Sequence, residues 1–271
     1  MSDVLAEIKQ LSKRYGSTAA LGQVSLQVKK GELFGLVGPD GSGKSSVLKI
    51  LAGVLSFESG SVTVFDQAVT SAKTAEIIKA RIGFMPQGLG QNLYRDLTVE
   101  ENIDFFAQLR LVDKKQLAEQ KNRLLQITRL APFKNRPMKK LSGGMKQKLG
   151  LICTLIHSPE LIILDEPTTG VDPVSRSDFW SILSQLIQEQ QVTAIVSTAY
   201  MDEAVRFDRC AVFNEGKVLA MGRVDEITAN VAGQVVAVRV APAYEALKTL
   251  QQNFEYIDVV ADTLRVYFDA A

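Results

Sequence analysis

The chain has 271 residues, of which 46% are hydrophobic, so it can form one large domain, with or without an appendage, around a substantial core. It carries 31 basic and 30 acidic residues, and this balance gives no reason to expect a nucleic acid as a partner. No apolar run approaches the ~20 residues that a membrane-spanning helix needs, so we expect any membrane role to depend on a partner protein.

Cysteine and histidine usage excludes several classes of site. Cys153 and Cys210 lie far apart in apolar sequence, which predicts buried thiols in a reducing cytosol rather than a disulfide or a metal pair. His157 is the only histidine, so a His-rich metal site is excluded. Its place at the end of an apolar helix before a strand favours a capping or packing role over catalysis.

The first part of the chain predicts strands and short helices. Alternating apolar residues predict two antiparallel strands, 6–15 and 23–29, that close on a turn at Lys30 and Gly31. The apolar run 33–37 predicts a buried strand, and 46–52 predicts a helix. The next elements are a strand at 61–65, a helix at 74–80 and a strand at 82–85.

A phosphate-binding loop follows the strand 33–37, because the sequence there matches the pattern G-x-x-x-x-G-K-[ST]. The predicted ATP-binding residues of this stretch are Gly38, Pro39, Asp40, Gly41, Ser42, Gly43, Lys44, Ser45 and Ser46. Glycines let successive N–H groups point at one anion, and the helix N-terminus adds partial positive charge. In this pattern Lys44 reaches the β- and γ-phosphates, and Ser45 offers its hydroxyl to Mg²⁺.

The stretch 88–140 predicts a mostly helical insertion. Thr98, with Glu101 three residues later, predicts a capped helix start, and residues 113–130 predict a longer polar helix. From residue 141 strands and helices alternate again, which predicts a largely parallel sheet covered on both faces. The expected elements are a helix at 142–157, a strand at 161–164, a helix at 173–190, a strand at 192–197, a short helix at 201–205 and a hairpin at 210–220.

Beyond residue 232 the pattern predicts a small β-α-β-β appendage, with strands at 235–240, 256–260 and 263–268 and a helix at 244–251. We therefore divide the chain into residues 1–230 and 231–271. Because the sequence stops directly after a strand, we expect that the full protein continues beyond Ala271.

Two carboxylates follow the apolar strand 161–164. In such sheets ligands bind at the carboxyl ends of the strands, so Asp165 is predicted to hold Mg²⁺ through water and Glu166 to polarise the attacking water. Gln87 follows the strand 82–85, and its amide oxygen suits a hard cation. Alone, the acids could equally be solvated and Gln87 could be an ordinary loop residue; the phosphate loop favours the functional interpretation.

A second anion cradle is predicted at a helix start, where Ser142 offers a hydroxyl and the glycines after it offer free N–H groups. Its residues are Leu141, Ser142, Gly143, Gly144 and Met145. Taken alone, this stretch could be an ordinary helix cap. Two cradles with one nucleotide suggest that each cradle closes on the nucleotide of a partner.

Together these motifs resemble the nucleotide-binding domain of ABC transporters over about residues 6–227. The resemblance implies an α/β P-loop NTPase fold with an antiparallel β subdomain, a helical subdomain at about 88–140 and a small C-terminal α+β extension. It implies that Tyr15 stacks on adenine, and it assigns 38–45 to Walker A, Gln87 to the Q-loop, 141–145 to the signature, Asp165 and Glu166 to Walker B, and Asp172 to the D-loop.

The sequence departs from the family at one position. The family has a histidine directly before the stretch Tyr200-Met201-Asp202-Glu203-Ala204, and this chain has Ala199 there. In the family that histidine contacts the γ-phosphate, whereas a methyl group can neither donate nor accept a hydrogen bond. Losing such a group often costs on the order of 10²–10³ in rate, so the resemblance implies a degenerate site that binds Mg·ATP but turns it over slowly.

The resemblance further implies an ATPase subunit of a drug- or polysaccharide-type exporter, peripheral at the cytoplasmic face of the inner membrane. Its cofactors would be ATP and Mg²⁺. Its partners would be a second ABC ATPase domain, either a copy or a tandem sibling, and a transmembrane permease that docks on the helical segment 88–140. Exposed apolar residues near Phe105 and Phe106 are candidates for this contact, although at least one of the two is expected to pack in the core. Two alternatives stay open. The first is a non-transport ABC protein acting on ribosomes or DNA, which would be expected to carry charged arms that the sequence lacks. The second is a regulatory ATP-binding module with little turnover, which Ala199 favours.

Overall fold

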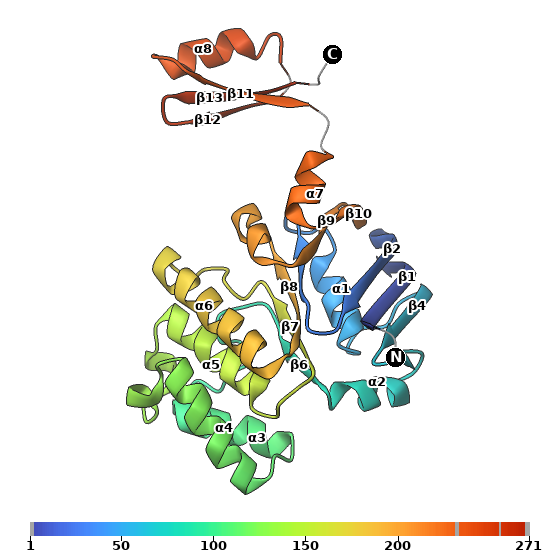
Figure 1. The fold of residues 1–271 in the computed structure, drawn as a ribbon, viewed down its shortest axis with the longest axis vertical. Helices are drawn as coiled ribbons and strands as arrows, with labels where there is room; N and C mark the ends of the chain where they lie inside the picture. The colour runs from blue at the N-terminus through green and yellow to red at the C-terminus, as the bar shows by residue number, and fades with distance from the viewer. Residues whose placement is uncertain (1–2, 231–232, 255, 269–271) are drawn as a thin grey trace. The chain divides into compact units, whose positions relative to one another are not determined.

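The computed structural model describes residues 3–230, 233–254 and 256–268 (Figure 1). The chain divides into two compact units, Met1–Val224 and Asp225–Ala271. This division falls inside helix α7 (Val224–Ala229), and the boundary that we place after residue 230 stays a prediction.

A six-stranded sheet forms the centre of the larger unit, in the order β10-β9-β3-β8-β7-β6. Its strands are β3 (Leu33–Val37), β6 (Ile82–Met85), β7 (Leu161–Asp165), β8 (Thr193–Thr198), β9 (Arg209–Asn214) and β10 (Lys217–Gly222). All neighbours are parallel except β9 and β10, and every residue of β3, β7 and β8 is buried. Continuous apolar runs are typical of parallel strands that are covered on both faces, as the sequence predicted.

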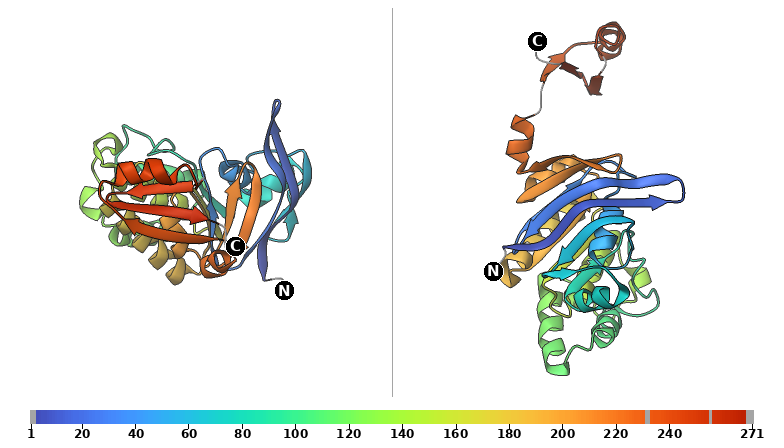
Figure 2. Two further views of the ribbon diagram at one scale, coloured as in Figure 1. Left: turned by 90° about the horizontal axis from the view of Figure 1, so that it is seen from above. Right: turned by 90° about the vertical axis from the view of Figure 1, so that its right-hand side faces the viewer.

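An antiparallel sheet packs beside it, in the order β2-β1-β4-β5. Its strands are β1 (Val4–Tyr15), β2 (Thr18–Lys29), β4 (Ser59–Val64) and β5 (Gln67–Ala68), and Figure 2 shows the long β1–β2 hairpin on the right. The predicted turn between the first two strands is wrong. They meet at Gly16 and Ser17, where Tyr15 pairs with Thr18 and Gly16 adopts a φ of 58°, whereas Lys30 and Gly31 connect β2 to β3.

Helices cover both faces of the parallel sheet. Helix α1 (Lys44–Leu51) lies between the two sheets, whereas α5 (Gly143–Leu155) and α6 (Pro173–Gln190) cover the opposite face (Figure 1). The side chains of α1, both sheets and α2 (Ala72–Lys79) form one buried apolar cluster. Cys153 and Cys210 are free and buried, as predicted.

The insertion is helical, with α3 (Val99–Leu109) and α4 (Lys114–Ile127) at its centre. The predicted cap is confirmed: Thr98 Oγ1 accepts from the N–H of Glu101 at 3.2 Å, and the Glu101 carboxylate accepts from the N–H of Thr98 at 2.7 Å. Among the described residues, no helix has both the length and the apolarity to cross a bilayer.

The smaller unit contains a three-stranded antiparallel sheet in the order β11-β13-β12. Its elements are β11 (Gln234–Arg239), α8 (Ala243–Leu250), β12 (Tyr256–Val260) and β13 (Thr263–Phe268). Helix α8 packs on β12 and β13, and the side chains of Leu264 and Val266 form the buried centre. The β-α-β-β order follows the predicted pattern.

His157 connects the end of α5 to the start of β6. Its Nε2 lies 3.2 Å from the carbonyl oxygen of Ile82, to which it can donate, so its role is packing rather than capping of α5. Burial, with the nearby charge of Arg110 as a smaller contribution, lowers the pKa of His157 from 6.5 to about 4.

We expect His157 to make the folded state acid-sensitive. Because its pKa is lower in the folded than in the unfolded chain, the unfolded chain binds the extra proton first, and stability falls as the pH drops below 6.5. The free energy of unfolding should fall by about 2 kcal/mol between pH 7.5 and 5. Urea titrations of the natural chain and of His157→Gln check this, since the variant should be nearly flat over that range. If the free energy of unfolding fell equally with pH in both proteins, His157 would not be the source of the acid sensitivity.

Candidate active site

The phosphate loop has the backbone that its glycines predict. It follows the buried strand β3, and α1 begins directly after Gly43, which adopts a φ of 101°. A Cβ at Gly43 would lie 2.7 Å from the carbonyl oxygen of Ala20, and one at Gly38 would lie 2.2 Å from that of Phe213. Only glycine fits at both positions, because neighbouring backbone leaves no room for a side chain.

Lys44 is a buried cation held inside this loop. It is 3% exposed, and its Nζ donates to the carbonyl oxygens of Gly38 at 2.8 Å and Pro39 at 2.9 Å. Its Nζ also lies 3.8 Å from Oε1 of Glu166. The ammonium group therefore lies where the loop meets Glu166, the residue directly after β7.

Asp165 connects three segments. Its Oδ1 accepts hydrogen bonds from Ser45 Oγ at 2.9 Å and Ser197 Oγ at 2.7 Å. Among the described residues its other oxygen, Oδ2, is buried and has no hydrogen-bond partner. A hydroxyl beside a carboxylate with a spare oxygen is a donor set that fits Mg²⁺, which prefers oxygen ligands.

Glu166 lies beside Asp165 in a strained conformation. Its φ is 47°, in the left-handed region, and the residue is 5% exposed. Its Oε2 accepts from Gln87 Nε2 at 2.8 Å and from Thr169 Oγ1 at 3.1 Å. Gln87 and Glu166, which the sequence places on separate segments, are thus brought into direct contact.

Tyr15 and Ala199 lie at the margins of this cluster. The Tyr15 ring is 51% exposed, and its hydroxyl lies 3.3 Å from Ser46 Oγ in the first turn of α1. Ala199 follows Thr198, whose carbonyl oxygen accepts from the N–H of Gly38 at 3.2 Å. Position 199 is therefore next to the phosphate loop, and no side-chain donor or acceptor is present there.

The second predicted cradle lies on another part of the fold. Ser142 is the N-cap of α5, and its Oγ accepts from the N–H of Met145 at 3.3 Å. Ser142 is exposed and Gly143 is half-buried, whereas Leu141 and Gly144 are buried. Because α5 and α1 cover opposite faces of the sheet, this cradle and the phosphate loop do not form one site within the chain (Figure 1).

Asp172 begins α6 in the same region as Ser142. Its side chain accepts from the N–H of Ser175 at 2.9 Å, and the hydrogen bonds from Ser175 lower the pKa of Asp172 below its usual value. This residue is exposed, so it can contact a neighbouring molecule.

Sequence reasoning missed Ser197 and Thr169. Ser197 bonds to Asp165 and also accepts from the N–H of Glu166 at 2.9 Å, so it orients both carboxylates. Ser197 could have been suspected because it is a polar residue near the carboxyl end of a buried strand, where ligands bind in such sheets. The partner of such a residue, however, depends on which strand lies beside it.

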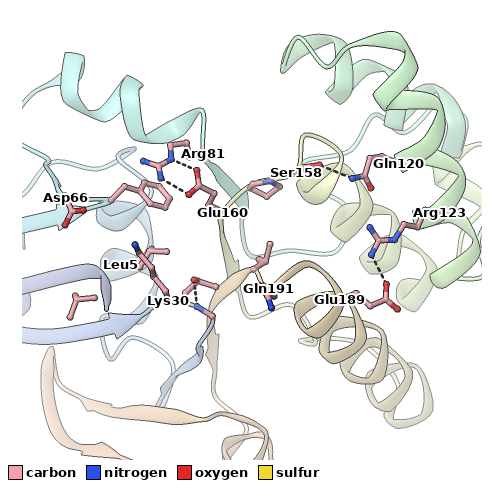
Figure 3. A pocket seen from close by; sticks show the side chains of 16 residues that line it. Leu5, Lys30, Asp66, Arg81, Gln120, Arg123, Ser158, Glu160, Glu189 and Gln191 are labelled. Carbon is pink, nitrogen blue, oxygen red and sulfur yellow. Dashed lines mark hydrogen bonds and ion pairs between the residues drawn. The ribbon is translucent and has the colours of Figure 1, made fainter. Parts of the chain in front are cut away.

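A pocket of about 520 Å³ lies at the other edge of the sheet, before the strands begin (Figure 3). Four of its charged side chains form two ion pairs, Arg81 with Glu160 at 2.5 Å and Arg123 with Glu189 at 2.7 Å. The pocket is therefore separate from the predicted nucleotide site.

Comparison with known proteins identifies the family. A family model described as ABC transporter matches residues 21–169, which is more than half of the chain. The chain belongs to the ABC transporter family. The matched range includes the predicted phosphate loop at 38–46, Gln87, the stretch 141–145, Asp165 and Glu166.

Relatives within the family are named for export and resistance. The chain is 40% identical to the probable multidrug ABC transporter ATP-binding protein YbhF of Escherichia coli K12, over 86% of this chain and 40% of that protein, so it spans less than half of that relative. It is 32% identical to a Nod factor export ATP-binding protein of Bradyrhizobium diazoefficiens, over 98% of this chain and 86% of that one. It is 30% identical to the linearmycin resistance ATP-binding protein LnrL of Bacillus subtilis 168, over 98% of this chain and 85% of that protein.

Solved structures share the ABC cassette fold. CbiO1 of Clostridium perfringens, part of the ABC transporter complex CbiONQ, has a TM-score of 0.78 at 24% identity, over 94% of this chain and 97% of that one. A dimeric ATP-binding cassette in a post-hydrolysis state, bound to ADP and Pi, has a TM-score of 0.72 at 25% identity, over 81% of this chain and 98% of that one.

The two signature glycines provide a matched pair of variants. A Cβ at Gly144 would lie 2.6 Å from the Cβ of Ser175 on α6, whereas one at Gly143 would meet nothing closer than 3.8 Å. We expect Gly144→Ala to lower the free energy of unfolding by about 1–3 kcal/mol, because α5 and α6 must separate, and Gly143→Ala to leave it nearly unchanged. Urea unfolding of both variants measures the difference, and equal stabilities would contradict the close packing of α5 on α6.

Proposed function

We propose that this protein is an ATP-binding subunit of an ABC exporter, which binds Mg·ATP and hydrolyses it to ADP and phosphate to drive a partner permease. One observation carries the proposal: Lys44, Ser45, Gln87, Asp165 and Glu166 come from three separate segments and meet at the carboxyl edge of one parallel sheet. In such sheets this edge is where ligands bind.

The roles of these residues follow from their chemistry. Residues 38–46 cradle the phosphates, with Lys44 as the counter-charge, and the exposed ring of Tyr15 stacks on adenine. Ser45, Asp165 and Gln87 hold Mg²⁺, which neutralises phosphate charge when it is bound. Glu166 orients the attacking water, and its contacts with Gln87 and Thr169 fix its carboxylate.

The proposed site is completed by a second ABC ATPase domain. The exposed Ser142, with Leu141, Gly143 and Gly144, would contact the partner's nucleotide, and Asp172 would lie at the same interface. The dimeric relative with bound ADP and Pi supports this arrangement. Because the chain spans only 40% of the length of YbhF, the partner domain could be a copy or a sibling in one longer chain.

The names of the relatives support export as the direction of transport. An aromatic cluster in the helical insertion suits the permease contact. Phe105 lies 4.4 Å from Tyr94 and 5.5 Å from Phe106 between ring centroids, and Tyr94 is 48% exposed. Such a subunit would be peripheral at the cytoplasmic face of the inner membrane, and co-purification with a permease tests this.

Ser45→Ala tests the metal site. Removing the hydroxyl should weaken ATP binding by roughly tenfold in the presence of Mg²⁺ and leave binding in EDTA nearly unchanged, because the hydroxyl bonds to Asp165 and the proposed metal rather than to the nucleotide. Ser181→Ala is the matched control, since its hydroxyl donates only to the carbonyl of Ser177 within α6. Equal Mg²⁺ dependence in both variants would refute the assignment of Ser45.

Ala199→His tests the degenerate site. The introduced imidazole would supply a polar group beside the phosphate loop, and we expect the single-turnover rate of ATP hydrolysis to rise by about 10²-fold. ATP affinity should change little, because the binding residues are already present. Brisk hydrolysis by the natural chain with no gain in the variant would show that position 199 does not limit turnover.

A further inference from the structure

Glu203 is a buried carboxylate that none of the proposed roles uses. It lies in the 3₁₀-helix η3 (Met201–Arg206) and is 2% exposed. It accepts hydrogen bonds from Thr168 Oγ1 at 2.8 Å, Trp180 Nε1 at 2.8 Å and Thr198 Oγ1 at 2.6 Å. A buried carboxylate is costly unless it is well hydrogen-bonded, so this group holds its three donors firmly.

Two of the three donors belong to segments that flank the proposed nucleotide site. Thr198 ends β8, and its carbonyl oxygen accepts from the N–H of Gly38 at the start of the phosphate loop, at 3.2 Å. Thr168 lies two residues after Glu166. The next residue, Thr169, donates its N–H to the Glu166 carbonyl at 3.2 Å and its hydroxyl to Glu166 Oε2 at 3.1 Å.

Trp180 supplies the third bond from the centre of α6. It is 1% exposed, and its ring packs edge-on against Phe179 and Phe207, with centroid distances of 6.3 and 5.7 Å. The indole N–H therefore ties the carboxylate to a rigid part of the core rather than to a loop of the site.

We propose that Glu203 is a positioning residue for ATP hydrolysis. One carboxylate fixes the loop that carries Glu166 against the strand end that borders the phosphate loop, and thereby sets the position of Glu166 relative to the phosphates. Misplacement of a reacting group by about 1 Å can cost 10²-fold in rate, so the effect should fall on turnover rather than on nucleotide affinity. This inference rests on the proposed ATPase function.

The test compares near-isosteric variants in the full chain. Thr168→Val and Thr198→Val each remove one bond to Glu203, and each should lower the single-turnover rate at saturating Mg·ATP about tenfold. The ATP concentration that gives half the maximal rate should stay within twofold. Glu203→Leu should show the larger loss, and Glu203→Gln should recover part of it, because its amide oxygen can still accept from Thr168 and Trp180.

Two controls separate positioning from general support of the fold. Thr128→Val removes an equally buried hydroxyl, bonded to the Leu124 carbonyl at 2.7 Å, and Trp180→Phe removes the third bond to Glu203. Both should keep the natural rate within twofold. If Thr168→Val and Thr198→Val hydrolysed ATP as fast as Thr128→Val, this inference alone would be overturned. The same holds if Trp180→Phe lost as much rate as Thr168→Val and Thr198→Val. A natural chain that neither binds nor hydrolyses ATP would overturn the proposed function and this inference with it.

Discussion

The candidate site depends on the parallel, in-register pairing of four buried strands. Val37 of β3 pairs with Thr198 of β8, Ser197 of β8 pairs with Asp165 of β7, and Leu164 of β7 pairs with Met85 of β6. Since these strands end side by side, the four segments that follow them must emerge at the same edge of the sheet. A shift of one strand by a residue would separate Ser45, Ser197 and Asp165.

The ionisable groups at this edge are buried and bonded to other parts of the site. Lys44, Asp165 and Glu166 are each at most 5% exposed, and each has a polar partner from another segment. Groups fixed in a site of low dielectric act more strongly on phosphate charge than solvated groups and need little reorganisation. The left-handed backbone of Glu166 is tolerated because Ser197, Gln87 and Thr169 hold it from three directions.

The position of the predicted signature is the reason why the proposed function requires a second domain. Within one chain the phosphate loop opens α1 on one face of the sheet, and Ser142 opens α5 on the other (Figure 1). Each is a helix start, and neither can complete the other within one chain. A nucleotide between the two kinds of surface therefore needs two domains.

Local features could be predicted from the sequence alone: the phosphate loop, the caps at Thr98 and Ser142, and the buried strands before Gly38 and Asp165. These could be predicted because each depends on residue types within a few positions, such as glycines that permit an unusual backbone or a hydroxyl that accepts from an N–H three residues on. The family resemblance followed from their order along the chain.

Which of these features meet follows from the three-dimensional fold and not from any local pattern. Ser45 contacts Asp165 across 120 positions of sequence, and Thr168 contacts Glu203 across 35. Such contacts depend on the order and register of the strands, which no local pattern encodes. The wrong turn at Lys30 and Gly31 has the same cause, because two turns flank β2 and only the pairing of β1 with β2 shows which of them joins the hairpin.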